Sequence, residues 1–102
     1  MKVVYNSCFG GFSISRKCAV WMADRCHAEA IKILKDEPFY GGFDGSRHDA
    51  LLVMAVEELG DAAAGSAACL EIHALRGSKY FIREYDGSET VIEPDDIRWI
   101  EV

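Results

Sequence analysis

The hydrophobic pattern of this chain changes from a helical to an alternating one between residues 63 and 69, and that change limits the folds open to it. Apolar residues recur at steps of three and four from Arg16 to about Leu34, and again from about His48 to Ala63. This spacing predicts two amphipathic helices. From Cys69 onward apolar and polar residues alternate, which indicates strands. Helices grouped ahead of a run of strands favour an α+β fold.

The strands are expected to be short and mainly antiparallel. Lys2–Asn6 is rich in β-branched and aromatic residues and predicts the first strand. Asp86-Gly87 is typical of a tight hairpin, because both positions tolerate positive φ. The sequence therefore predicts a single domain, residues 1–102, with two helices packed on one face of a three- to four-stranded sheet. The other expected strands are Cys69–Leu75, Lys79–Tyr85, Ser88–Glu93 and a short Ile97–Val102.

The charge and hydropathy of the chain disfavour two classes of partner. The net charge is −6, and the eleven basic residues are scattered, with no run longer than Arg16-Lys17. Binding through nucleic-acid phosphates needs clustered Lys and Arg, so direct nucleic-acid binding is not expected. The longest apolar run, Ala50–Val56, is far shorter than the roughly 20 residues of a membrane-spanning helix. Asn6 interrupts the first apolar stretch too early for a signal peptide, and a cytoplasmic location is expected.

The four cysteines are expected to be free thiols in a reducing compartment. They are Cys8, Cys18, Cys26 and Cys69, and they form no Cys-x-x-Cys pair; the three histidines form no His-x₃-His pair. Structural zinc sites usually show such close pairs. The sequence therefore predicts neither a bound metal nor another cofactor.

The glycine-rich turn after the first expected strand is a candidate ligand site. A strand, a glycine turn and a helix N-terminus can together hold an anion through free backbone N–H groups. The same position would lower the pKa of a cysteine. Ser13 or Ser15 could cap the helix that follows. The alternative is a structural turn beside a small buried thiol. The candidate ligand-binding residues are Cys8, Gly10, Gly11, Ser13 and Ser15.

Exposed aromatic and acidic residues are candidates for a partner surface, because aromatics dominate binding hot spots. The loop of residues 38–47 holds three aromatic residues and three glycines. Glu84 and Asp86 flank Tyr85 at the hairpin, where paired carboxylates could also transfer protons or hold a divalent ion. The alternatives are aromatics packed in the core and a solvated hairpin tip. The candidate partner-binding residues are Trp21, Tyr40, Phe43, Glu84, Tyr85 and Asp86.

Three segments carry a resemblance that spans most of the chain. They are residues 3–15 (VVYNSCFGGFSIS), the stretch from Arg47-His48-Asp49 to the VEELG motif of residues 56–60, and residues 82–89 (IREYDGSE). In this order they resemble a family of small phage and prophage proteins of unknown function. The family carries no assigned catalytic residues, so the resemblance implies no active site.

The resemblance implies a phage-encoded accessory protein. Small phage proteins of this sort often bind host machinery, so we expect a noncatalytic binding module that acts on a host protein and is a candidate inhibitor of a host defence system. The alternative is a small-ligand binder, of nucleotide-like compounds, that uses the glycine-rich turn. Because no catalytic constellation is evident in the spacing, an enzyme is not expected. An exposed sheet edge makes a homodimer a further expectation.

Overall fold

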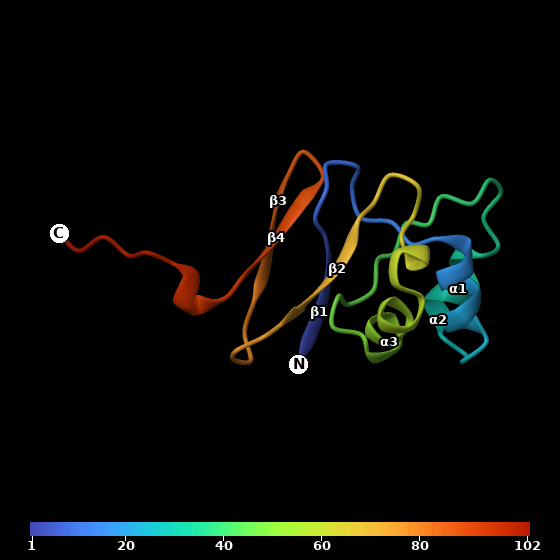
Figure 1. Cartoon of the computed structure of the whole chain (residues 1–102), viewed down its shortest axis with the longest axis horizontal. Helices are drawn as coiled ribbons and strands as arrows, with labels where there is room; N and C mark the ends of the chain where they lie inside the picture. Colours follow the sequence, from blue (N-terminus) through green and yellow to red (C-terminus); the bar gives the residue numbers. More distant parts are fainter.

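A computed structural model describes residues 1–102 and confirms the α+β class (Figure 1). The chain forms strand β1 (Lys2–Asn6), helices α1 (Arg16–Ala23), α2 (Ala28–Ile33) and α3 (Ala50–Leu59), the 3-10 turn η1 (Gly60–Ala63), strands β2 (Leu70–Ala74), β3 (Phe81–Tyr85) and β4 (Ser88–Ile92), and the 3-10 turn η2 (Pro94–Asp96). No helix has both the length and the apolar character needed to cross a membrane.

The four strands form two antiparallel ladders instead of the single sheet that was expected. β1 pairs with β2, and β3 pairs with β4. β4 lies beside β1, but backbone pairing between them is blocked, because the amides on that edge of β1 are already bonded. The Val4 amide donates to the carbonyl oxygen of Arg47 at 2.8 Å, and the Asn6 amide donates to Glu89 Oε1 at 2.9 Å.

The helix expected from Arg16 to about Leu34 is two helices, which corrects that prediction. Ser15 caps α1, since its Oγ accepts from the Cys18 amide at 3.0 Å. After α1 the chain turns through Cys26, which has a φ of 64°, a left-handed conformation that ends a helix. His27 then caps α2, because its Nδ1 accepts from the Ala30 amide at 3.2 Å.

The helix expected from about His48 to Ala63 is shorter in the structure, because α3 runs only from Ala50 to Leu59. Asp49 caps α3 by accepting from the amides of Leu51 and Leu52, whereas Ser46 Oγ accepts from His48 outside the helix. Asp49 Oδ2 also lies 3.0 Å from His27 Nε2, which links the start of α3 to the start of α2. α3 ends at Leu59, and the chain continues as η1.

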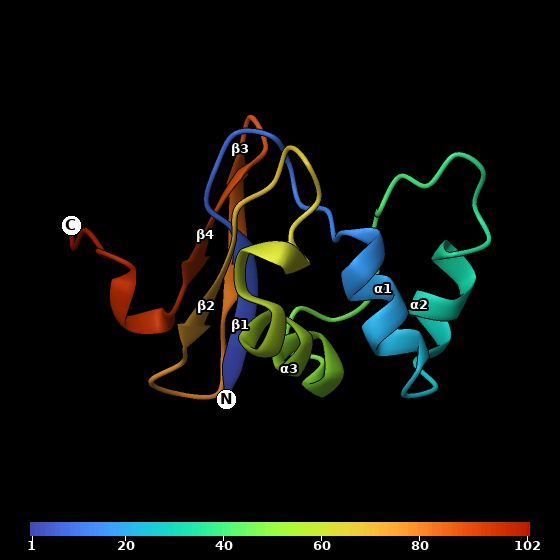
Figure 2. The same ribbon diagram turned by 45° about the vertical axis from the view of Figure 1, so that its right-hand side comes forward.

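The helices and the β3–β4 hairpin lie on opposite sides of the β1–β2 ladder (Figure 2). The core therefore forms between the helices and β1–β2, where Ile14, Met22 and Leu52 are fully enclosed together with Val4. Residues 97–102 leave the hairpin after η2 and extend away from the rest of the molecule (Figure 1). The last strand expected at Ile97–Val102 is therefore wrong, because no residue after η2 pairs with a strand.

Candidate functional site

Three segments of the chain enclose a groove of about 450 Å³ beside the start of α1. The first is the stretch after the glycine turn, residues 13–16 together with Gly10. The second is the pair Phe39 and Tyr40 from the loop before α3. The third is residues 64–67, which follow η1. The groove thus forms where the expected strand–turn–helix unit meets two distant loops.

Backbone hydrogen bonds fix the walls of the groove to one another. The Ile14 amide donates to the Gly41 carbonyl at 2.9 Å, and the Ser15 amide donates to the Ala63 carbonyl at 2.8 Å. The Gly65 amide donates back to the Ser13 carbonyl at 3.0 Å. Because these bonds hold all three segments, the backbone of the groove walls is fixed by the fold.

Gly10 allows the glycine turn to lie against the third wall. A Cβ atom at position 10 would stand 1.6 Å from the Ala67 carbonyl oxygen, so no other residue fits there without a backbone shift. Gly11 has a φ of 85° and open space around it, so its requirement is conformational. Of the two glycines only Gly10 lines the groove.

The start of α1 brings a positive charge and free donors to the groove. Ser15 Oγ is occupied, because it donates to the Ala62 carbonyl at 2.6 Å and accepts from the Cys18 amide. The first amides of the helix, those of Arg16 and Lys17, have no intrahelical carbonyl to bond. The Arg16 guanidinium lies 4.7 Å from the centre of the Phe39 ring and takes part in none of the ion pairs of the structure. The groove therefore offers an unneutralised cation beside aromatic rings.

Cys8 lies behind the wall of the groove. Its Sγ is 3.3 Å from the Ala67 carbonyl oxygen and 3.4 Å from Asn6 Oδ1. A hydrogen bond from the Cys69 thiol, and then one from the Gly10 amide, lower the pKa of Cys8. The structure thus brings Gly10, Ser13 and Ser15 of the predicted ligand site together at the groove, and it places Cys8 and Gly11 outside it.

The predicted aromatic surface does not form as expected. Phe43 is only 6% exposed and packs against the rings of Phe12 and His27, which corrects its assignment to a partner surface. Trp21 is half-buried, and the Arg25 guanidinium covers its ring at 3.5 Å. Tyr40 is 74% exposed, but it lines the groove. The three residues therefore belong to three different environments.

At the hairpin tip the candidate partner-binding residues are exposed, as in the alternative of a solvated tip. Tyr85 is 77% exposed, and Glu84 and Asp86 are also exposed. Glu89, opposite Glu84 in the ladder, is buried and paired with Arg47 at 2.6 Å. No group of three His, Cys, Asp or Glu side chains lies close enough to hold a metal ion. Glu84 and Asp86 therefore stand without a third carboxylate partner.

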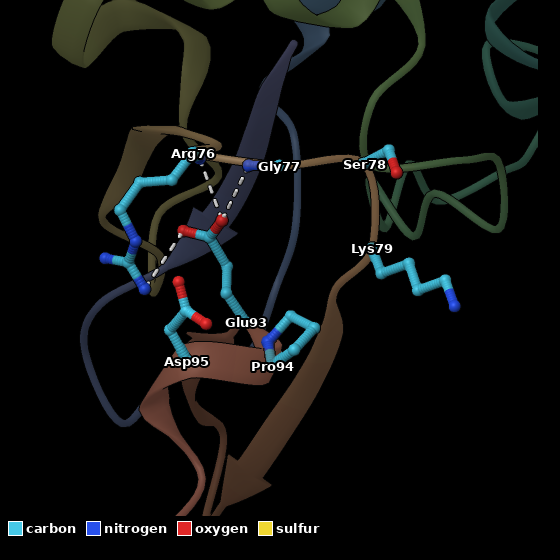
Figure 3. A pocket seen from close by; sticks show the side chains of 7 residues that line it. All are labelled: Arg76, Gly77, Ser78, Lys79, Glu93, Pro94 and Asp95. Carbon is cyan, nitrogen blue, oxygen red and sulfur yellow. Dashed lines mark hydrogen bonds and ion pairs between the residues drawn. The ribbon is translucent and has the colours of Figure 1, made fainter.

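A second hollow, of about 220 Å³, lies at the base of the hairpin (Figure 3). Its central group is Glu93, which is 2% exposed and points toward the turn that begins at Arg76 (Figure 3). Its carboxylate accepts from the Arg76 amide at 2.8 Å and the Gly77 amide at 3.3 Å, and it lies 2.8 Å from His73 Nε2. These contacts fix the Glu93 carboxylate against the turn, so Glu93 acts as an anchor of the turn.

Sequence reasoning missed several residues that shape these sites. Arg16 belongs to a short basic run with Lys17, and nothing in its spacing relates it to Phe39. Glu89 and Glu93 have the alternation of solvent-facing strand residues, although the structure buries both.

Comparisons of the chain with known protein families, with curated proteins and with solved structures return no match.

Proposed function

We propose that the protein is a noncatalytic binding module whose groove takes a small anionic ligand with a planar ring, of the nucleotide class. The observation that carries the proposal is the position of Arg16. Its guanidinium stacks on Phe39 at the groove, has no carboxylate partner and stands beside the free amides that begin α1. Such a combination recognises phosphate and carboxylate groups.

The remaining groove residues support the ring-bearing part of the ligand. Tyr40 is 74% exposed, an unusual position for a large aromatic side chain that also lines a hollow. Base–aromatic stacking is worth about 1–3 kcal/mol and depends little on the identity of the base. A ring stacked on Tyr40 would leave the anionic group to reach Arg16, which lines the same groove.

Thermal shift across a panel of nucleosides and nucleoside mono-, di- and triphosphates tests this proposal. A ligand that binds only the native state raises its melting temperature, so we expect a shift with the phosphorylated compounds and a smaller one with nucleosides. Arg16→Gln removes a charge-assisted contact worth about 2 kcal/mol, which weakens binding about thirtyfold. Isothermal titration calorimetry measures that change.

Arg25→Gln is the matched control, because Arg25 also stacks on an aromatic ring, that of Trp21, but lies outside the groove. This variant should bind as the unaltered protein does. The absence of any shift at millimolar ligand, or equal losses in the two arginine variants, would contradict the proposal.

A protein partner is our second proposal, and the exposed tip of the β3–β4 hairpin supports it. Here the protein is a phage-encoded accessory protein that acts on a host protein through Tyr85 and its flanking carboxylates, Glu84 and Asp86. Acidic groups around an exposed tyrosine suit a basic partner surface. Crosslinking in host lysate should give a partner band that Tyr85→Ala abolishes and Trp99→Ala, another exposed aromatic, retains. An unchanged band in Tyr85→Ala counts against this surface.

A further inference from the structure

Two of the four cysteines meet just beyond the end of the β1–β2 ladder. The Ser7 amide donates to the Cys69 carbonyl at 2.9 Å, so this backbone hydrogen bond joins Cys69 to the residue just before Cys8. Asn6 Oδ1 binds both cysteines, since it accepts from the Cys69 amide at 2.8 Å and from the Cys8 thiol at 3.4 Å. A shared acceptor holds the two residues beside each other although 61 positions separate them in the sequence.

The two thiols differ from the buried Cys18 in exposure and in pKa. Cys69 is exposed and Cys8 is half-buried, so small reagents can reach both. The hydrogen bond from Cys69 lowers the pKa of Cys8, and the same bond raises the pKa of Cys69. Cys18, in contrast, is enclosed in the core, and burial raises its pKa to about 11. Cys8 therefore becomes a thiolate more readily than Cys69 or Cys18, and the thiolate is the reactive form.

We propose that Cys8 and Cys69 form a dithiol modification site that reacts with small-molecule disulfides of the glutathione class and closes into an intramolecular disulfide. The Cys8 thiolate attacks one sulfur of the small disulfide, which forms a mixed disulfide and releases one thiolate. Cys69 then loses its proton and attacks the Cys8 sulfur, and the second small thiolate leaves. The two protein thiols are oxidised by two electrons, and the small disulfide is reduced to two thiols.

Closure of this disulfide also alters the groove. In the reduced protein Cys8 Sγ contacts the Ala67 carbonyl, and Gly10 is packed against the same residue, so Cys8 lies directly behind the wall that residues 64–67 provide. Moving the Cys8 sulfur onto Cys69 removes that contact. The expected effect on ligand affinity rests on the proposed function, whereas formation of the disulfide does not.

The test treats the reduced protein with oxidised glutathione under native conditions and follows the intact mass and the peptide map. We expect the unaltered protein to lose two hydrogen atoms, to yield a single crosslinked peptide that joins Cys8 to Cys69, and to return to its original mass with dithiothreitol. Cys26→Ser should behave identically, because Cys26 is exposed but lies in the turn between α1 and α2. Cys69→Ser should stop at the mixed disulfide on Cys8, since no second thiol resolves it.

The unaltered protein alone can overturn the proposal, so the test does not depend on any variant folding. A peptide map with glutathione on Cys26 and none on Cys8, or a crosslink that includes Cys26, would refute the assignment. Because the readout is mass and no ligand is present, failure of the disulfide is distinguished from failure of the nucleotide groove. The oxidised form should also melt at a higher temperature, since the bond would close a loop of about sixty residues in the unfolded chain.

Discussion

Glu89 joins three parts of the molecule that are distant in the sequence. Its carboxylate accepts from the Asn6 amide at the end of β1 and from both terminal nitrogens of Arg47, at 2.6 and 2.8 Å. Arg47 in turn lies over the Phe12 ring at 3.6 Å, and its carbonyl accepts from Val4. Glu89 is only 8% exposed, so the ion pair replaces contacts that both charges would make with water.

The charge of Glu89 should therefore matter far more than that of a surface carboxylate. Glu89→Gln keeps an oxygen for the Asn6 amide but leaves Arg47 without a counter-charge in a mostly buried position. We expect the free energy of unfolding to fall by about 3 kcal/mol, the lower end of the cost of breaking a buried pair. Urea denaturation measures this loss.

Glu57→Gln is the comparison, because Glu57 pairs with Lys2 and both side chains are about half exposed. An exposed pair is worth about 1 kcal/mol or less, so this variant should be near the unaltered protein in stability. Equal losses in the two variants would mean that the Arg47–Glu89 pair does not hold the ladders together.

The β3–β4 hairpin is attached to the rest of the molecule through side chains, because its strands pair only with each other. At the tip, Asn6 Nδ2 donates to the Gly87 carbonyl at 2.8 Å. At the base, Glu93 contacts His73 on β2 and the two amides of the turn. The hydrogen bond from His73, and then those from the turn amides, hold the pKa of Glu93 below its usual range against the opposing effect of burial.

This anchor predicts a loss of stability in acid. Because the pKa of Glu93 is lower in the folded state, the unfolded state takes up the proton first as the pH falls. The stabilisation is complete above the unfolded value of about 4.3 and disappears as the pH drops through the lower, folded value. The free energy of unfolding of the unaltered protein should therefore fall more steeply below about pH 5 than that of Glu93→Gln.

Glu71→Gln serves as the control, since Glu71 lies on the neighbouring strand β2, is exposed and makes no hydrogen bond through its side chain. Its pH dependence should match that of the unaltered protein. Parallel curves for the unaltered protein and Glu93→Gln would show that this carboxylate does not fasten the hairpin.

The positions of the helices and strands follow from local sequence pattern, whereas their boundaries and the groove depend on contacts between residues that are distant in the sequence. The hairpin turn lies where Asp86-Gly87 predicts it, with φ values of 50° and 88°. The break between α1 and α2 was missed because no glycine or proline marks it, and because Ala19, Met22, Ala30 and Ile33 keep the helical spacing on both sides.

The same contrast holds for the groove. Ser13 and Ser15 could be placed near a helix start, since the glycine turn precedes them. In contrast, Tyr40 and Phe43 belong to one loop, and only Phe43 is buried in the core. That outcome depends on Phe12 and His27, which lie far away in the sequence. Local pattern contains no information on such pairings.

For the whole molecule, the position of β1 decides the order in which the fold can be completed. β1 precedes the helices in the chain, yet its partner strand β2 begins only at Leu70. The carboxylate that binds the Asn6 amide on the other edge of β1 belongs to Glu89. Contacts of such long sequence separation are slow to form and cannot form on a nascent chain that lacks them. Along the chain, the Arg47 carbonyl that bonds Val4 comes first, β2 comes next, and Glu89 comes last. The bond from Asn6 to Glu89, which closes the second edge of β1, can therefore form only after the hairpin has left the ribosome.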